Sequence, residues 1–406
     1  MSITRQNKWV LMVAIAIGHG IQHLYLQGFL MFLPLIKADM SLSPIQSSLL
    51  VTSRNFLGGT LNFPLGVLSD ILYKHWRIIL AGTTIWAGGS YLLLGLAPNY
   101  LLILFSCSLI GVSSMAWHHP AISTLSQRIK NQRGLAISIH ATGASTGESL
   151  APILTGFLLV SISWRTLSHY AILPCIIFAI LLWWLLPGVQ GIKDQTNKDN
   201  SFIVAVRHFI RSKVLLGLMF VMALQSAGRF GLLTFFTIYL KEDLLYDTPA
   251  IGLHLTLITL LGMGSAPILG ILSDKFGRKP VLATALFMAA LGAYLLGVTA
   301  SGWQFTLAVA FLGLTFYAVT SISIAAAMDA APTGGEGTTI GVLFTGGSLS
   351  SIVSPIITGV LVSATGENST AFYYGSACIM LSCIISLIVP LPKKDQLPPP
   401  KLMAEL

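Results

Sequence analysis

Residues 270–280 read "GILSDKFGRKP". This motif is the most specific indication of the fold, because each part of it is typical of a loop that joins two helices and holds them in contact. Gly270 lets helices approach closely, and Asp274 stands at a helix end, where it can accept hydrogen bonds from the N-terminus of a neighbouring helix. Gly277 suits a tight turn, and the basic pair that follows favours a cytoplasmic loop. We therefore predict a latch between two helices, which opens and recloses when the helices move.

The motif is part of an internal repeat. "PLGVLSD" at 64–70 recurs as "ILGILSD" at 268–274, an offset of 204 residues, and "APILTG" at 151–156 recurs as "SPIITG" at 354–359, an offset of 203. Such self-similarity indicates two halves with the same topology. The first copy has Tyr73 where the turn glycine belongs, so we expect a weaker first latch. The gating residues predicted from both copies are Gly66, Asp70, Gly270, Asp274, Gly277, Arg278 and Lys279.

The composition places both halves in a membrane. Hydrophobic residues make up 54% of the 406-residue chain and charged residues only 9%, whereas soluble domains carry about 25% charged residues. A membrane-spanning helix needs roughly 20 predominantly apolar residues, and continuous runs favour helices over a barrel. The twelve predicted spans are 9–36, 44–69, 78–97, 100–119, 134–162, 166–186, 214–240, 250–273, 281–300, 303–327, 339–363 and 371–391.

Positive charge is concentrated on one side of these spans. The formal net charge is +9, and 18 of the 23 Lys and Arg residues fall at the termini or in alternate loops. This distribution follows the positive-inside rule. We expect a multi-pass inner-membrane protein with both termini cytoplasmic, in contact with the lipid bilayer and with no nucleic-acid partner.

The fold class that follows is an all-α membrane protein with twelve transmembrane helices in two pseudo-symmetric six-helix bundles. The bundles cover 1–186 and 214–392. Between them, 187–213 is a cytoplasmic linker whose second part is either a short interfacial helix or the start of the seventh span. The tail, 393–406, is rich in proline and is expected to be disordered. Parallel repeats of this kind build a large group of secondary transporters, and we expect a monomer.

The latch motif and its repeat resemble the loop signature of the major facilitator superfamily. A narrower resemblance, to the fosmidomycin resistance protein family, lies in "GHGIQHLYLQGFLMFLPLI" at 18–36 and in "SSMAWHHPAISTLSQ" at 113–127. It implies export of small drugs driven by the proton gradient, and His19 and His119 match the family pattern. Two departures matter, because Gln22-His23 replaces an Asn-Asp pair and Ala121 replaces an acid. Two carboxylates expected for proton coupling are therefore missing.

Glu148 is the leading candidate to replace them, since it is the one acid well inside a span. Intramembrane ionisable residues usually face a cavity or a partner. Helices 2 and 5 can face each other in the facilitator fold, so we expect Glu148 to pair with Arg54. The pair could carry protons or gate the cavity, or it could be a static link between two helices. His140, eight residues earlier on the same helix, could relay a proton from Glu148.

The remaining polar residues within spans are candidates for the solute site. His19 and His23 are one turn apart and project to one face, where they could contact protons or solute, form structural hydrogen bonds or bind a metal. Arg229 in the seventh span suggests an anionic group on the solute, or else pairs with Glu148 or reaches toward the membrane surface. The predicted proton-coupling residues are Glu148, Arg54, His23 and His140, and the predicted solute-binding residues are His19, Gln22, Trp117, His119, Gln225 and Arg229.

Other classes of protein fit less well. The histidines cluster too little in the cytoplasmic loops for a di-iron membrane enzyme, which stays a remote alternative, and no zinc motif, phosphate loop or nucleophile elbow is present. The four cysteines lie within spans at no metal-binding or disulfide spacing. We therefore expect no enzyme, no cofactor and no metal. The predicted function is proton-coupled export of a small, drug-like or anionic solute, with import of a metabolite or a metal chelate as the alternative.

Overall fold

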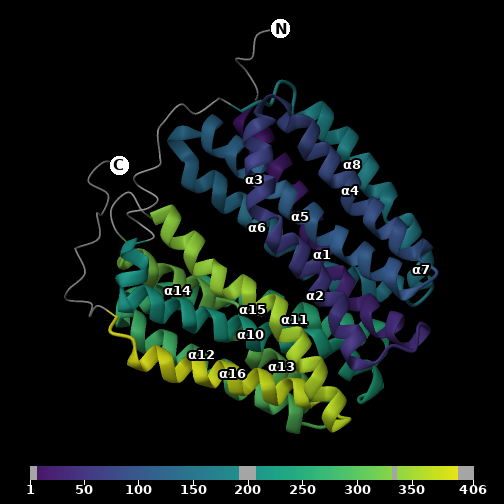
Figure 1. Ribbon diagram of the computed structural model, residues 1–406, viewed down its shortest axis with the longest axis vertical. Coiled ribbons are helices and arrows are strands. Elements are labelled where there is room, and N and C mark those ends of the chain that lie inside the picture. The colour runs from purple at the N-terminus through teal and green to yellow at the C-terminus, as the bar shows by residue number, and fades with distance from the viewer. Residues whose placement is uncertain (1–6, 192–206, 332–335, 392–406) are drawn as a thin grey trace. The chain divides into compact units, whose positions relative to one another are not determined.

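The computed structural model describes residues 7–191, 207–331 and 336–391, and within these ranges the regular structure is entirely helical (Figure 1). The helices that precede the linker are α1 (Lys8–Asp39), α2 (Pro44–Thr60), α3 (Asn62–Ile71), α4 (Trp76–Leu96), α5 (Tyr100–Arg128), α6 (Arg133–Leu158), α7 (Trp164–Tyr170) and α8 (Ile172–Leu185), with the short 3₁₀ turns η2 (Tyr73–His75) and η3 (Lys130–Gln132). Those after it are α10 (Lys213–Glu242), α11 (Thr248–Phe276), α12 (Arg278–Val298), α13 (Trp303–Phe316), α14 (Ala318–Asp329), α15 (Glu336–Thr365) and α16 (Thr370–Ile388).

These helices correspond to the twelve predicted spans, three of which are broken into two helices: α2 with α3, α7 with α8, and α13 with α14. Ten of the spans in the described residues are long and apolar enough to cross a membrane. Two of the twelve predicted spans do not meet this criterion. One is α2 with α3, and the other is α6, in which glycine, hydroxyl and ionisable residues lower the mean hydropathy. The predicted end of the fourth span at residue 119 is wrong, because α5 continues to Arg128 through a more polar segment.

Several helix starts follow from local sequence. Ser43 caps α2 in a capping box with Gln46, and Pro44 follows in the first turn, where its missing N–H costs nothing. Asn99 and Ser163 cap α5 and α7 through their side-chain oxygens. Each of these caps satisfies a backbone N–H that would otherwise lack a partner. The capping residues therefore fix the beginnings of three helices.

The chain forms two compact units. Unit 1 comprises Met1–Gln195, Leu233–Leu260 and Pro355–Ala371, and unit 2 comprises the remaining segments. Residues 207–211 are helical, but the first part of the predicted interfacial helix, like the predicted disordered tail at 393–406, lies outside the described residues.

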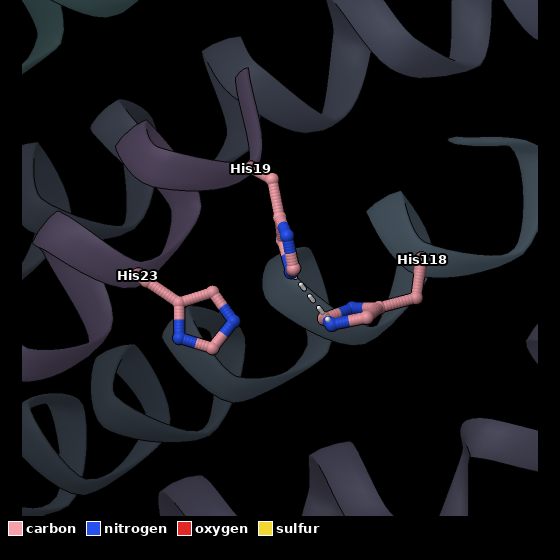
Figure 2. Close-up of side chains that lie close together, drawn as sticks. All are labelled: His19, His23 and His118. Carbon is pink, nitrogen blue, oxygen red and sulfur yellow. Dashed lines mark hydrogen bonds between the residues drawn. The ribbon is translucent and has the colours of Figure 1, made fainter. Parts of the chain in front are cut away.

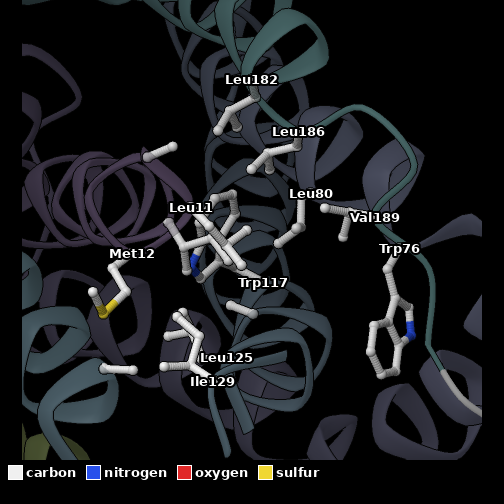
Figure 3. Packing of buried hydrophobic residues seen from close by; sticks show 14 of the residues in the cluster. Leu11, Met12, Trp76, Leu80, Trp117, Leu125, Ile129, Leu182, Leu186 and Val189 are labelled. Atoms are coloured by element: carbon white, nitrogen blue, oxygen red, sulfur yellow. The ribbon is translucent and has the colours of Figure 1, made fainter. Parts of the chain in front are cut away.

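The apolar core of unit 1 surrounds Trp117 (Figure 3). Trp117 has no exposed surface, and a Cβ on Gly18 would lie 2.1 Å from its ring, so the glycine provides the space for the indole. The core cluster around it is Leu11, Met12, Ala14, Ile15, Trp76, Leu80, Ala121, Leu125, Ile129, Ala136, Phe178, Leu182, Leu186 and Val189. This packing holds α1, α4, α5, α6 and α8 together.

Helices α1 and α6 cross at backbone contact. A Cβ on Gly143 would lie 2.0 Å from the carbonyl oxygen of Ala16, and a Cβ on Gly147 would lie 2.0 Å from that of Gly20. Real Cβ atoms do not approach so closely, so only glycine fits at either position. Small residues four apart allow such close helix packing in membranes. This glycine pair therefore allows α1 and α6 to pack at backbone contact.

The loop of the second half is held by ion pairs, and we call Ser273, Asp274, Gly277, Arg278 and Asp329 the C-terminal latch. The close helix approach predicted at Gly270 is wrong, because nothing lies within 4 Å of the position of its Cβ. Gly277 makes the turn with φ +96°, a conformation that favours glycine. The Arg278 guanidinium pairs with Asp274, donates to Ser273 Oγ at 2.7 Å and donates through Nε to Asp329 Oδ2 at 2.9 Å. Arg278 is thus the centre of the latch, and Asp329 at the end of α14 is a partner that the motif did not reveal.

The corresponding loop in the first half has neutral hydrogen bonds around Trp76, and we call Ser69, Tyr73, Trp76 and Gly191 the N-terminal latch. The Trp76 indole N–H donates to the Ser69 carbonyl at 2.9 Å, and the Gly191 N–H donates to the Tyr73 carbonyl at 2.7 Å. Gly191 also packs on the buried Trp76 ring. As the sequence indicated, this loop has no glycine turn at position 73, which begins a 3₁₀ turn instead.

We expect Asp329→Asn to destabilise unit 2 by about 1–2 kcal/mol, because it removes the charge from a hydrogen bond to an ionised partner. Asp274→Asn is the matched control. The Asp274 side chain is 66% exposed, compared with 23% for Asp329, so solvent screens its pair with Arg278 and its loss should have a smaller effect. Thermal unfolding of the two purified variants measures the difference. An equal loss of thermal stability in the two variants, or no loss in Asp329→Asn, would show that Asp329 makes no special contribution to the C-terminal latch.

Candidate functional site

Four imidazole rings meet inside unit 1. His19 and His23 come from α1, His118 from α5 and His140 from α6. The rings of His19 and His23 are 4.6 Å apart, as their spacing of one helical turn predicted. The close α1–α6 crossing brings His140 against His19, where the two rings stack at 3.7 Å. We call these four residues, with Glu148, the histidine cluster.

Each ring of the cluster is fixed by an oxygen acceptor or a stacked neighbour. His19 Nδ1 lies 2.8 Å from the His140 carbonyl oxygen, and His118 Nδ1 lies 2.6 Å from that of Ser114. His23 Nδ1 lies 2.7 Å from Glu148 Oε1. His19 Nε2 faces His118 Nε2 at 3.1 Å (Figure 2). The rings of His19, His23 and His118 place one ligand nitrogen each within 4.8 Å of one another.

The cluster is buried at one end and partly accessible at the other. His19 is 5% exposed and His140 3%, whereas the side chains of His23 and Glu148 are 15% and 28% exposed. Of the residues predicted for proton coupling, His23, His140 and Glu148 lie in this cluster, together with His19 from the predicted solute-binding set. Their predicted roles in proton coupling and solute binding stay predictions.

The predicted pair between Arg54 and Glu148 is wrong. Arg54 donates to the Leu26 carbonyl at 2.6 Å and lies over the Phe29 ring, 5.6 Å from its centroid, while Glu148 binds His23. Arg54 thus contacts α1 at Leu26 and Phe29, which follow His23 along the helix. The sequence placed both charges within spans but gave neither their depth nor the rotation of their helices.

The predicted solute-binding residue His119 lies outside the cluster, and its neighbour His118 lies inside it. His118 is in the cluster, whereas His119 Nε2 lies 2.9 Å from the Asn62 carbonyl and its ring lies against Gly66 of the repeated motif. Adjacent helical residues point about 100° apart. Only one of the two could therefore face α1, and the chain places His118 there.

Three further predicted solute-binding residues are deeply buried. Gln22 is 1% exposed, and neither amide atom has a hydrogen-bond partner among the described residues. Gln225 donates to the Phe316 carbonyl at 3.1 Å. Trp117 belongs to the apolar core, so its position supports packing rather than solute contact.

Arg229 on α10 is held by aromatic rings of unit 2. Its guanidinium carbon lies 4.9 Å from the Phe230 ring centroid and 5.3 Å from that of Tyr317. Its Nε atom is buried and has no hydrogen-bond partner among the described residues. Cation–π contacts can orient a guanidinium, but they leave its N–H donors unsatisfied. At least one N–H donor of this permanent positive charge is therefore unpaired among the described residues.

Comparison with known proteins agrees with this architecture. The chain is 22% identical to the fosmidomycin resistance protein of Escherichia coli, covering 75% of this chain and 77% of that protein. It is 23% identical to the hexuronate transporter of Bacillus subtilis, covering 84% of each. The fold matches the crystal structure of a bacterial homologue of the human lysosomal transporter Spinster, with a TM-score of 0.78, 16% identity and coverage of 94% and 95%.

The family assignment rests on most of the chain. The sequence profile of the Major Facilitator Superfamily matches residues 15–247 and 218–404. The predicted twelve-helix fold, with transport rather than catalysis as its activity, is thereby confirmed. The chain belongs to the Major Facilitator Superfamily and is a secondary transporter of small solutes.

Proposed function

We propose that this transporter exports a small organic anion from the cytoplasm by alternating access, with the proton gradient as its driving force. It would act in the inner membrane as a monomer, with both termini cytoplasmic. The observation that carries the proposal is Arg229, a cation within a membrane span whose Nε has no hydrogen-bond partner among the described residues. An arginine binds carboxylate and phosphate groups through paired N–H donors.

The relatives support an anionic solute. A hexuronate carries a carboxylate, and the chain aligns with the hexuronate transporter over most of its length. The resemblance to the fosmidomycin resistance protein supports export of a drug-like compound. Import of a metabolite or a metal chelate is the second candidate, and the hexuronate transporter favours the metabolite because a hexuronate is itself one.

A ligand screen tests the charge of the solute. We expect small carboxylates and phosphates to stabilise the purified protein, by about 2.7 kcal/mol at a concentration one hundred times the Kd. Each anion is paired with a neutral analogue of the same size, for example a hexuronate with the parent hexose. Stabilisation by the neutral member of each pair and not by the anion would overturn the proposal.

Direction and driving force are tested in proteoliposomes loaded with the best-binding anion. We expect an imposed proton gradient to move the anion against the proton flow, and an uncoupler to abolish the movement. Movement of anion and protons in the same direction would establish import instead. Reconstitution with protein of known orientation is the control, because random insertion hides the direction.

A further inference from the structure

The hydrogen bonds of the histidine cluster determine where its ring protons are. The carbonyl oxygens of His140 and Ser114 can only accept hydrogen bonds, so Nδ1 of His19 and Nδ1 of His118 must each carry a hydrogen. His23 Nδ1 lies 2.7 Å from Glu148 Oε1 and donates to it when Glu148 is ionised. In the neutral form, each of the three rings therefore presents a lone pair at Nε2.

The three Nε2 atoms converge. His19 Nε2 and His118 Nε2 are 3.1 Å apart, so two lone pairs face each other at hydrogen-bond distance (Figure 2). His23 turns one ring nitrogen toward the same point, and its Nε2 is buried with no hydrogen-bond partner among the described residues. Such an arrangement is unfavourable unless a cation lies between the rings. One proton could join two of the nitrogens but would leave the third unsatisfied.

We propose that His19, His23 and His118 bind a divalent first-row transition-metal ion, with zinc, copper and nickel as the ions best suited to imidazole. Two nitrogens on a tetrahedral zinc ion are about 3.3 Å apart, close to the separation of the His19 and His118 nitrogens. The ligand nitrogens lie within 4.8 Å of one another, so His23 needs to move by about 1.5 Å to complete the set.

The surroundings of the three rings match those of metal-bound histidines. A histidine that binds a metal usually donates its other N–H to a carboxylate or a backbone carbonyl, which fixes the ring and its tautomer. Here Glu148 holds His23, and the carbonyls of His140 and Ser114 hold His19 and His118. Glu148 is thus a positioning residue, and the fourth coordination position remains for water or solute. The partly exposed end at His23 and Glu148 is the route by which an ion would enter.

The test is metal binding by the full-length chain, purified in detergent with a tag that contains no histidine and stripped with a chelator. We expect isothermal titration to show one zinc ion per chain and Cu²⁺ electron paramagnetic resonance to show nitrogen ligands. His118→Ala should abolish this binding. Glu148→Gln should weaken it about 10- to 100-fold, as loss of such supporting groups does elsewhere.

His119→Gln is the matched control, because His119 is adjacent on α5 but lies outside the cluster, against Asn62. It should retain the affinity of the unmodified chain. No binding of zinc, copper or nickel by the unmodified chain would overturn the proposal whether or not any variant folds. Binding that survives His118→Ala and His19→Ala, or that is lost equally in His119→Gln, would also overturn it. These outcomes are independent of the solute and of the direction of transport.

Discussion

Replacing Gly147 with leucine is expected to leave little folded protein in the membrane. The added Cβ alone would lie 2.0 Å from the Gly20 carbonyl oxygen, and that atom belongs to the backbone of α1, which cannot move aside like a side chain. The two helices would have to separate, and overpacking of this kind costs about 3 kcal/mol or more. Separation would also displace His23 from Glu148. Size-exclusion chromatography of the solubilised protein measures the loss.

Gly82→Leu is the control for this substitution. Gly82 also lies within a helix of unit 1, but nothing surrounds the position of its Cβ within 4 Å. The same change there should leave the yield of monodisperse protein unchanged, or raise it slightly because leucine favours helix more than glycine does. Equal yields of the two variants would show that α1 and α6 do not pack at backbone contact.

Replacing Arg229 with alanine is expected to weaken binding of the anionic solute by about 2–4 kcal/mol, roughly 30- to 1000-fold in Kd. The reason is the loss of a charged N–H donor that would pair with the anionic group of the solute. Without solute, the thermal stability should not fall and could rise, because the variant no longer buries part of an unpaired charge. Titration of the best anion from the ligand screen, with thermal unfolding of the solute-free protein, measures both effects.

Two variants control for charge in this experiment. Arg229→Lys keeps the charge but loses the paired N–H donors, so it should recover part of the affinity. Arg211→Ala removes an equal charge from an exposed position and should leave the affinity unchanged. An affinity unaffected by Arg229→Ala, or lowered as much by Arg211→Ala, would exclude direct contact between Arg229 and the solute.

The fold could be predicted from the sequence because two signals act over many residues. Apolar runs of membrane length account for ten of the spans, and the internal repeat pointed to the other two and to the paired loops after Asp70 and Asp274. The C-terminal end of α5 was missed because its last segment is polar and lies outside the apolar run. The breaks within spans were missed because an apolar run does not show where a helix is interrupted. Asp329 was missed because its contact with Arg278 joins residues 51 apart in the chain, which no local pattern encodes.

The site was only partly predictable, since residue spacing fixes one helix face but not which helix that face meets. The spacing of four between His19 and His23 correctly predicted a shared face. It could not show that His118, rather than His119, completes the group, nor that Glu148 meets His23 rather than Arg54. Those choices depend on the depth and rotation of α2, α5 and α6, which are set by tertiary packing such as the glycine contacts of α6.

The C-terminal latch is held by ion pairs and the N-terminal latch by hydrogen bonds between neutral groups, so the two should respond differently to ionic strength. Mobile ions screen partly exposed charges over about 8 Å at physiological salt, so added salt should loosen the Arg278 pairs of the C-terminal latch. The N-terminal latch, with neutral hydrogen bonds around a buried Trp76, should be almost unaffected, and sulfate would strengthen its apolar contacts. Added salt is therefore expected to separate the two loops of this repeat, by weakening the contacts of one and leaving those of the other intact.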